Sequence, residues 1–185
     1  MGNMRLWLTP TQAESIGRFA LDGRPEEVCG IIGGIGERAK QIVSIENSSP
    51  DPQRHFRLDD QAFAKAMFEL EHNGLSLIGI YHSHPNGNPI PSQEDIQQSN
   101  YPSTACVIVG LRDGEPRLAA WEILPGRVNT VDLHVGINAP EPADSELSNA
   151  QKTAIILAAI IAVAFLLIVS ISLLPPAPVI VTPLP

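Results

Sequence analysis

The chain has 185 residues, of which 44% are hydrophobic and 17% are charged, and its formal net charge is -8. This length suits one folded domain with an appended segment, and the composition is that of a folded chain and not of a disordered one. The negative charge argues against a nucleic-acid backbone as the main partner, because the chain has little positive charge with which to neutralise phosphates.

The first predicted element is a helix over residues 9–21, "TPTQAESIGRFAL". Thr9 is placed to cap this helix, Pro10 occupies its first position, and Gln12 follows the cap by three residues, as in a capping box. Four apolar residues recur on one helical face and are expected to pack on the core: Ala13, Ile16, Phe19 and Ala20.

Strands and two more helices are predicted beyond this point. Apolar runs bounded by turn residues predict six strands, at residues 27–35, 41–46, 75–82, 104–111, 117–124 and 127–135. Helices are predicted at residues 59–72 and 92–100. This mixture predicts an α+β fold, with one domain over residues 1–135 that packs helices against a mixed sheet. Cys29 and Cys106 lie in apolar, strand-like runs and are expected to be buried thiols, not disulfide partners.

The C-terminal part of the chain has a different composition. Residues 136–152 are polar and acidic with two prolines, which predicts a flexible linker. Residues 153–174 carry no charge, and as a helix they would be about 33 Å long, enough to cross a hydrocarbon core of about 30 Å. The alternative, a buried core helix, is disfavoured because the segment has no periodic polar face. Residues 175–185 form a short uncharged tail. Lys152 is the only cation near this span, so the positive-inside rule predicts a single-pass, C-terminally anchored membrane protein whose large domain is cytoplasmic.

The stretch "IYHSHPNGNPIPSQED", residues 80–95, has the residue types of a metal site. His82 and His84 flank Ser83 at the end of a predicted strand, and alternate residues of a strand point to the same face. Pro85 cannot continue a central strand, so both histidines are expected where the strand leaves the sheet. Catalytic zinc sites use three protein ligands and leave a fourth position open, and Asp95 is the nearest carboxylate placed to be the third.

Another interpretation of the same residues is structural. Ser92 followed after three residues by Asp95 has the form of a capping box, so Ser92 could be no more than the cap of a short helix. His82 and His84 could likewise be exposed loop residues. The two interpretations are compatible, because a cap can hold the turn that directs Asp95 toward the histidines.

A hydrolytic zinc site also needs a residue that accepts a proton from water. In "RPEEVCGIIGG" two acids precede a buried strand. Glu26 is best interpreted as a solvated residue, whereas the residues alone leave open whether Glu27 lies beside the histidines. Residues 50–58, "PDPQRHFRL", are predicted to be a loop that could border a substrate groove.

The segments "EEVCGIIGG", "GIYHSHP" and "PSQED" together resemble the JAMM (MPN-plus) metallopeptidases in their compact prokaryotic form. The signature of that family is a Glu, then His-x-His-Pro, then Ser-x-x-Asp, and all of its elements occur here in order. The resemblance spans roughly residues 5–135. It implies the MPN/JAB-like fold, a curved mixed β-sheet flanked by helices.

The resemblance also implies a role for each residue of the signature. His82, His84 and Asp95 would bind one Zn²⁺ per chain. Glu27 would be the general acid/base, and Ser92 would donate a hydrogen bond to the developing oxyanion.

The function implied by the resemblance is that of a zinc-dependent peptidase or isopeptidase. Its substrate would be a ubiquitin-like or sulfur-carrier β-grasp protein, cleaved next to the C-terminal tail of that protein. The alternative is a non-catalytic, zinc-stabilised scaffold or binding module tethered to the membrane. Such relatives usually lack one or more ligands, and the complete set of ligands in this chain argues against that alternative.

Overall fold

The computed structural model of the chain describes residues 4–102, 104–138 and 149–172. These residues belong to two compact units, Met1–Pro140 and Glu141–Pro185. Within the described residues, the first unit contains all of the strands and three helices, and the second contains one helix.

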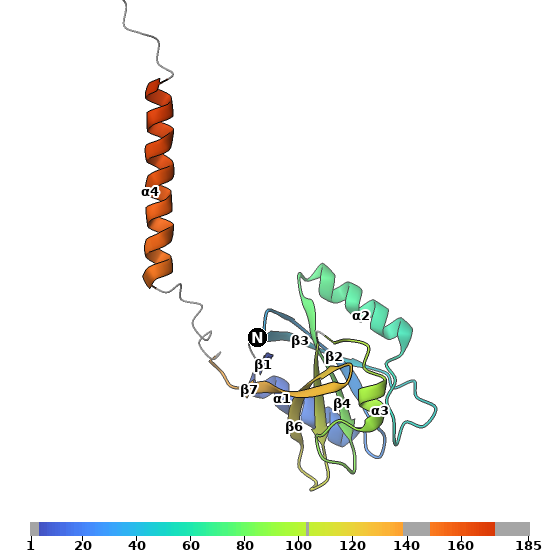
Figure 1. Cartoon of the computed structure of the whole chain (residues 1–185). Helices are drawn as coiled ribbons and strands as arrows, with labels where there is room; N and C mark the ends of the chain where they lie inside the picture. The colour runs from blue at the N-terminus through green and yellow to red at the C-terminus, as the bar shows by residue number, and fades with distance from the viewer. Residues whose placement is uncertain (1–3, 103, 139–148, 173–185) are drawn as a thin grey trace, which may run out of the picture. The chain divides into compact units, whose positions relative to one another are not determined.

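The strands of the first unit form a single mixed sheet that closes into a barrel in the order β1-β3-β2-β4-β5-β6-β7 (Figure 1). Their bounds are β1 Arg5–Leu8, β2 Cys29–Ile35, β3 Arg38–Ile45, β4 Ser76–His84, β5 Ala105–Gly110, β6 Arg117–Leu124 and β7 Arg127–Val135. Pairing is antiparallel except where β1 meets β3 and β7 and where β4 meets β5. The predicted α+β class and the six predicted strands are confirmed.

Closure of the sheet depends on β1, which was not predicted from the sequence. This strand has only four residues, and it lies parallel to β7 with Arg5 opposite Asp132 and Leu8 opposite Val135. Its other edge meets β3 at a single pair, Trp7 and Arg38. The sheet was predicted to be curved, and in the structure it closes fully. Because β7 pairs with β1, β7 is not a free sheet edge.

The helices of the first unit are α1 Pro10–Asp22, α2 Asp60–His72 and α3 Gln93–Gln97. The predicted capping box of α1 is present: the Gln12 backbone N–H donates to Thr9 Oγ1 at 3.2 Å, and the Thr9 N–H donates to Gln12 Oε1 at 2.9 Å. Gly74 follows α2 with a φ of +68°, a conformation that glycine adopts without strain.

The two longer helices cover different faces of the sheet. Ile32 of β2 belongs to the core cluster that includes Ile16 of α1, whereas its neighbour Ile31 packs with Ala66 and Leu70 of α2. Successive side chains of a strand point to opposite faces, so β2 is buried on both sides. Strand β4 lies between β2 and β5, with His82 opposite Cys29 and beside Ile108. The end of β4 is thereby held in place from both sides.

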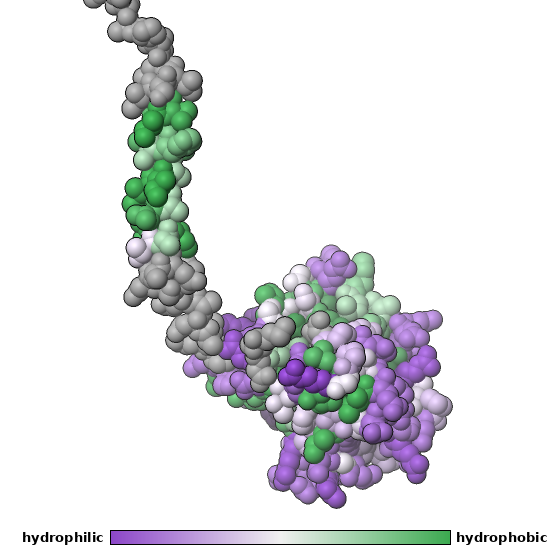
Figure 2. All heavy atoms as spheres, in the orientation of Figure 1, coloured by the Kyte–Doolittle hydropathy of each residue, from purple (hydrophilic) through white to green (hydrophobic). Residues whose placement is uncertain are grey.

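The second unit contains α4, Asn149–Ser172, which is 24 residues long. Within it, Thr153–Ser170 is long and apolar enough to cross a membrane, by length and composition. Large apolar side chains of α4 are exposed along its length, as the continuous hydrophobic surface in Figure 2 shows. The predicted span 153–174 agrees with α4 up to residue 172, but α4 begins at Asn149, so the last four residues of the predicted linker 136–152 are helical. Most of the predicted linker and the predicted tail, 175–185, lie outside the described residues.

Candidate metal centre and active site

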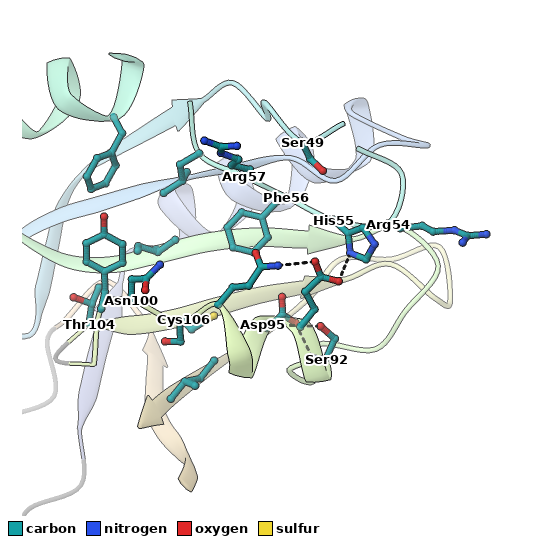
Figure 3. Close-up of a pocket in the computed structure, with 18 of the residues that line it drawn as sticks. Ser49, Arg54, His55, Phe56, Arg57, Ser92, Asp95, Asn100, Thr104 and Cys106 are labelled. Carbon is teal, nitrogen blue, oxygen red and sulfur yellow. Dashed lines mark hydrogen bonds and ion pairs between the residues drawn. The ribbon is translucent and has the colours of Figure 1, made fainter. Parts of the chain in front are cut away.

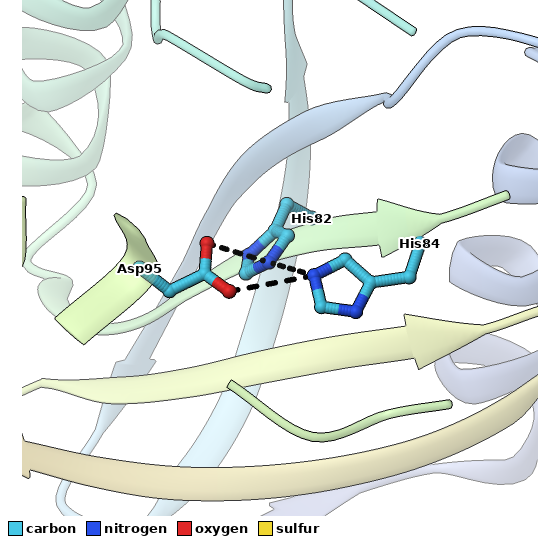
Figure 4. Close-up of side chains that lie close together, drawn as sticks. All are labelled: His82, His84 and Asp95. Atoms are coloured by element: carbon cyan, nitrogen blue, oxygen red, sulfur yellow. Dashed lines mark hydrogen bonds and ion pairs between the residues drawn. The ribbon is translucent and has the colours of Figure 1, made fainter. Parts of the chain in front are cut away.

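The two histidines of the signature lie at the end of β4 and point to the same side of the sheet (Figure 4). His82 is fully buried, and the side chain of His84 is 14% exposed. Asp95 comes from the short helix α3 and faces both rings. The structure thus brings together the three residues that were predicted as metal ligands, and one ligand atom from each lies within 4.8 Å of the others.

The separations between these ligand atoms fit a zinc ion. His82 Nε2 and His84 Nε2 are 3.1 Å apart, and the carboxylate oxygens of Asp95 lie 3.3 Å from His82 Nε2 and 3.4 Å from His84 Nε2. A tetrahedral ion with bonds of about 2.0–2.1 Å requires ligand atoms about 3.3 Å apart. Two imidazoles and one carboxylate are also a donor set of the kind found in catalytic zinc sites.

Neighbouring groups orient both imidazoles. His84 Nδ1 lies 3.0 Å from the carbonyl oxygen of Asn88, to which an Nδ1–H donates, so Nε2 is the ring nitrogen that faces the site. His82 Nδ1 lies 4.0 Å from Cys106 Sγ, and the ring of Phe56 stacks on the His82 ring with centroids 4.2 Å apart and planes inclined by 14°. These contacts present Nε2 of each histidine to a metal ion.

The protonation preferences of the three residues agree with this arrangement. Burial opposes ionisation of Asp95, but hydrogen bonds from His82 and His84 outweigh it and hold the pKa of the Asp95 carboxyl well below its usual range. Burial lowers the pKa of His82, so its imidazole is neutral at neutral pH. Burial also opposes protonation of His84, yet the hydrogen bond to Asp95 raises the pKa of His84.

Ser92 caps the helix that carries Asp95. The Ser92 backbone N–H donates to Asp95 Oδ2 at 2.6 Å, and the Asp95 N–H donates to Ser92 Oγ at 3.1 Å. The structural interpretation of these two residues as a capping box is therefore correct, and it coexists with the convergence of Asp95 on the histidines. Because Ser92 Oγ accepts in the cap, its own hydroxyl proton can still be donated to another group.

Glu27 lies just before β2 and is buried, with 7% of its surface exposed. In the antiparallel register of β2 and β4, Cys29 is opposite His82, so continuing the register by two residues places Glu27 opposite His84. Burial raises the pKa of Glu27 to about 7, with His84 lowering it and Asp95 raising it. An acid with a pKa near neutrality can both accept and return a proton. Glu26, predicted to be solvated, is exposed.

Ser83 connects the strand of the histidines to the segment of Glu27. Its hydroxyl oxygen accepts from the Val28 backbone N–H at 2.9 Å, and its own backbone N–H donates to the Val28 carbonyl at 2.9 Å. Ser83 is fully buried, so water cannot replace either bond. Together with the bonds of the Glu27 backbone to Pro52 and Asn47, the residue between the two histidines helps to fix where Glu27 lies.

A cavity of about 630 Å³ opens beside Asp95 and Ser92 (Figure 3). The loop of residues 50–58 lines it, as predicted, and so do the far end of α3 and the start of β5. Two of its lining residues, His55 and Glu94, pair directly, with His55 Nδ1 2.7 Å from Glu94 Oε2. Of the three candidate metal ligands, Asp95 lines this cavity.

Several supporting residues had no signal in the sequence. Phe56 and Cys106 contact His82 from segments 26 and 24 residues away. The guanidinium of Arg24 donates to the carbonyls of Pro85, at 3.0 Å, and of Leu111, and so anchors the loop after His84. His55 binds Glu94, the neighbour of Asp95 in the chain. Burial raises the pKa of Cys106 to about 12, so its thiol stays protonated.

Comparison with known proteins agrees with this fold and site. The family model for prokaryotic homologs of the JAB domain matches residues 11–124. The chain is 28% identical over 128 residues to a desampylase from Haloferax volcanii, covering 65% of this chain and 91% of that protein. It is 38% identical over 77 residues to a protein of Thermus thermophilus named "Probable TtuB-protein conjugate cleaving protease", covering 42% of this chain and 51% of that relative.

A solved structure shows the same architecture. A protein from Desulfitobacterium hafniense superposes with a TM-score of 0.65 at 26% identity, covering 72% of this chain and 94% of that one. The chain therefore belongs to the family of prokaryotic homologs of the JAB domain. This membership confirms the resemblance to JAMM metallopeptidases and the MPN/JAB-like fold that it implied.

Proposed function

We propose that this protein is a zinc-dependent peptidase or isopeptidase with one metal ion per chain, held by His82, His84 and Asp95. The observation that carries the proposal is the convergence of the three side chains at the end of β4: His82 Nε2 and His84 Nε2 are 3.1 Å apart, and Asp95 Oδ1 and Oδ2 lie 3.3 Å and 3.4 Å from them, respectively. These separations match a tetrahedral zinc site. When bound there, zinc would supply a Lewis acid that polarises a carbonyl group and promotes ionisation of water at neutral pH.

The residues around the metal ligands have separate roles in the proposed reaction. Glu27, with its pKa raised to about 7, accepts a proton from the attacking water and later gives it to the leaving amine. Ser92 donates a hydrogen bond from its hydroxyl to the oxygen on which negative charge develops. Ser83 and Arg24 touch no reacting atom and act as positioning residues, since they hold Val28 and Pro85 next to the site.

The substrate class follows from the family. One relative is named for cleaving protein conjugates and another as a desampylase, and the family resemblance implies a ubiquitin-like or sulfur-carrier β-grasp protein. We infer that the bond cleaved here lies next to the C-terminal tail of such a carrier. The cavity beside Asp95 is open to an extended segment of this kind.

The apolar helix suggests where the reaction takes place. Thr153–Ser170 has the length and composition of a membrane span. We infer that α4 anchors the chain in a membrane, with the metal site on the cytoplasmic side as Lys152 predicts.

The test uses the full chain in detergent, loaded with zinc and assayed for bound metal. It is incubated with a panel of β-grasp carriers, each extended by a C-terminal peptide or joined to a lysine by an isopeptide bond, and the intact masses of the products are measured. Cleavage of one member by the native chain, together with loss of both zinc and cleavage in Asp95→Asn, is the expected result. One zinc per chain without cleavage of any carrier would contradict the peptidase and favour a zinc-stabilised scaffold.

A further inference from the structure

The cavity beside the metal ligands has one polar side and one apolar side. Its charged lining residues largely pair with each other: His55 with Glu94 at 2.7 Å, and Arg57 with Asp60 at 3.5 Å. The side chains of Arg57 and Asp60 are 65% and 88% exposed, so this pair lies at the rim. Away from the charged groups the lining is apolar and comes from five different segments: Phe56, Leu58, Phe63, Ile80, Tyr101 and Ile123.

The apolar side lies next to the candidate ligands along β4. Ile80 precedes His82 by two residues, so both side chains point to the same face of the strand. At about 3.3 Å per residue their Cα atoms are separated by about 7 Å along the strand. If an extended substrate peptide ran alongside β4 from the metal ligands, its second residue would lie next to Ile80.

Phe56 makes the apolar side continuous with the metal site. Its ring stacks on His82 at a centroid distance of 4.2 Å and also lines the cavity, beside Asp95 and Cys106 (Figure 3). At the far side, the rings of Phe63 and Tyr101 meet with centroids 5.7 Å apart and planes inclined by 51°. Tyr101 remains 39% exposed, so this aromatic pair has surface left for another apolar group.

We propose that this apolar side is a subsite for a bulky apolar side chain of the substrate, one or two residues from the cleaved bond. The proposal rests on the peptidase function and adds a sequence requirement to it. A tail made only of glycine would leave these apolar surfaces in water, whereas a leucine or phenylalanine would bury them and gain affinity. Because the charges at the rim already pair with each other, they would attract a charged substrate side chain at the same position only weakly.

Binding, not cleavage, is the measurement that tests this subsite. The probes are labelled decapeptides of Gly, Ser and Thr in which a single Ala, Leu, Phe or Asp occupies each position in turn. Fluorescence anisotropy reports their affinity for the full chain carrying Glu27→Gln, loaded with zinc and held in lipid nanodiscs. At one position we expect Leu or Phe to bind about tenfold tighter than Ala, and Asp to bind no better than Ala.

Variants on one helix separate the subsite from nonspecific apolar binding. Phe63→Ala removes one wall of the cavity and should abolish the preference. Phe68 is also on α2 but is 71% exposed and does not line the cavity, so Phe68→Ala should retain it. Tyr101→Ala is a second variant of the wall whose position outside the core spares folding, and thermal unfolding checks all three.

The outcomes distinguish this subsite from the peptidase itself. A positional preference that Tyr101→Ala and Phe63→Ala both remove supports the subsite, even if no carrier protein is cleaved. Equal affinity for all peptides, or a preference that both variants retain, overturns the subsite, even if the native chain cleaves a carrier.

Discussion

The end of β4 and the helix α4 depend on their residues in different ways. At the end of β4 every position has its own partner: Ser83 binds Val28, His82 stacks on Phe56, and His84 faces the carbonyl of Asn88. In α4 the property that matters is shared by the whole segment Thr153–Ser170, namely its length and lack of charge.

This difference has a physical origin. A metal site requires ligand atoms to be placed within a few tenths of an ångström, so a single altered atom changes its chemistry. A membrane span requires only that enough apolar surface face the lipid, so one apolar residue can replace another at small cost. We therefore expect conservative changes of the residues around the metal ligands to be measurable and conservative changes in α4 to be harmless, and charges to be severe in α4.

The largest effect is expected from two charges in α4. Ile161→Lys combined with Leu166→Lys should cost about 5–7 kcal/mol of insertion free energy, because each lysine near the centre of a span costs about 3 kcal/mol. Membrane association, measured by flotation of cell membranes, should be lost. The matched pair Ile161→Phe and Leu166→Phe should remain in the membrane fraction, and its release would refute the anchoring role of α4.

A smaller but still large effect is expected from Glu27→Gln. This change keeps the shape of the side chain but removes its ability to carry a proton, so turnover should fall about 100- to 10,000-fold. Bound zinc, measured by atomic absorption, should remain at one per chain. Glu26→Gln alters the adjacent, exposed carboxylate and should leave turnover unchanged. Equal losses in the two variants would remove Glu27 from its proposed role.

The raised pKa of Glu27 also predicts how the stability of the zinc-free protein depends on pH. The folded protein holds this proton up to about pH 7, whereas the ordinary value is 4.5. The contribution of Glu27 is therefore present below about pH 4.5 and is lost as the pH rises to about 7. The difference in pKa sets an upper bound of about 3 kcal/mol, which solvent screening reduces to about 2 kcal/mol.

Glu27→Gln isolates this contribution, because all other titrating groups remain. In urea unfolding, the native protein should lose about 2 kcal/mol relative to the variant between pH 4.5 and pH 7. Parallel stability curves over this range would show that Glu27 titrates normally.

The smallest effect is expected from Ser83→Ala. It leaves the partly buried Val28 N–H without its acceptor, which costs about 1–2 kcal/mol in the free energy of unfolding. Ser44 also accepts a hydrogen bond, from the Tyr81 hydroxyl at 3.1 Å, but it is exposed to water. Ser44→Ala should therefore cost less in the same urea titration. An equal cost for the two serines would contradict the positioning role of Ser83.

What the sequence determined by itself was the local structure. The cap at Thr9 and the capping box from Ser92 to Asp95 join residues only three apart, so their geometry is contained in the local pattern. The span of α4 follows from composition alone, since lipid is a uniform solvent. The strand-end histidines were predicted from the period of two along β4.

Only the tertiary structure decided which distant residues meet. Whether Glu27 lies beside His84 depends on the register of β2 and β4, which are separated by about 40 residues of chain and held by contacts such as that of Ser83. The stacking of Phe56 on His82 and the closure of the sheet by β1 depend in the same way on long-range packing. A shift of one residue would turn every side chain of a strand to the opposite face, and no local pattern encodes which register packs best.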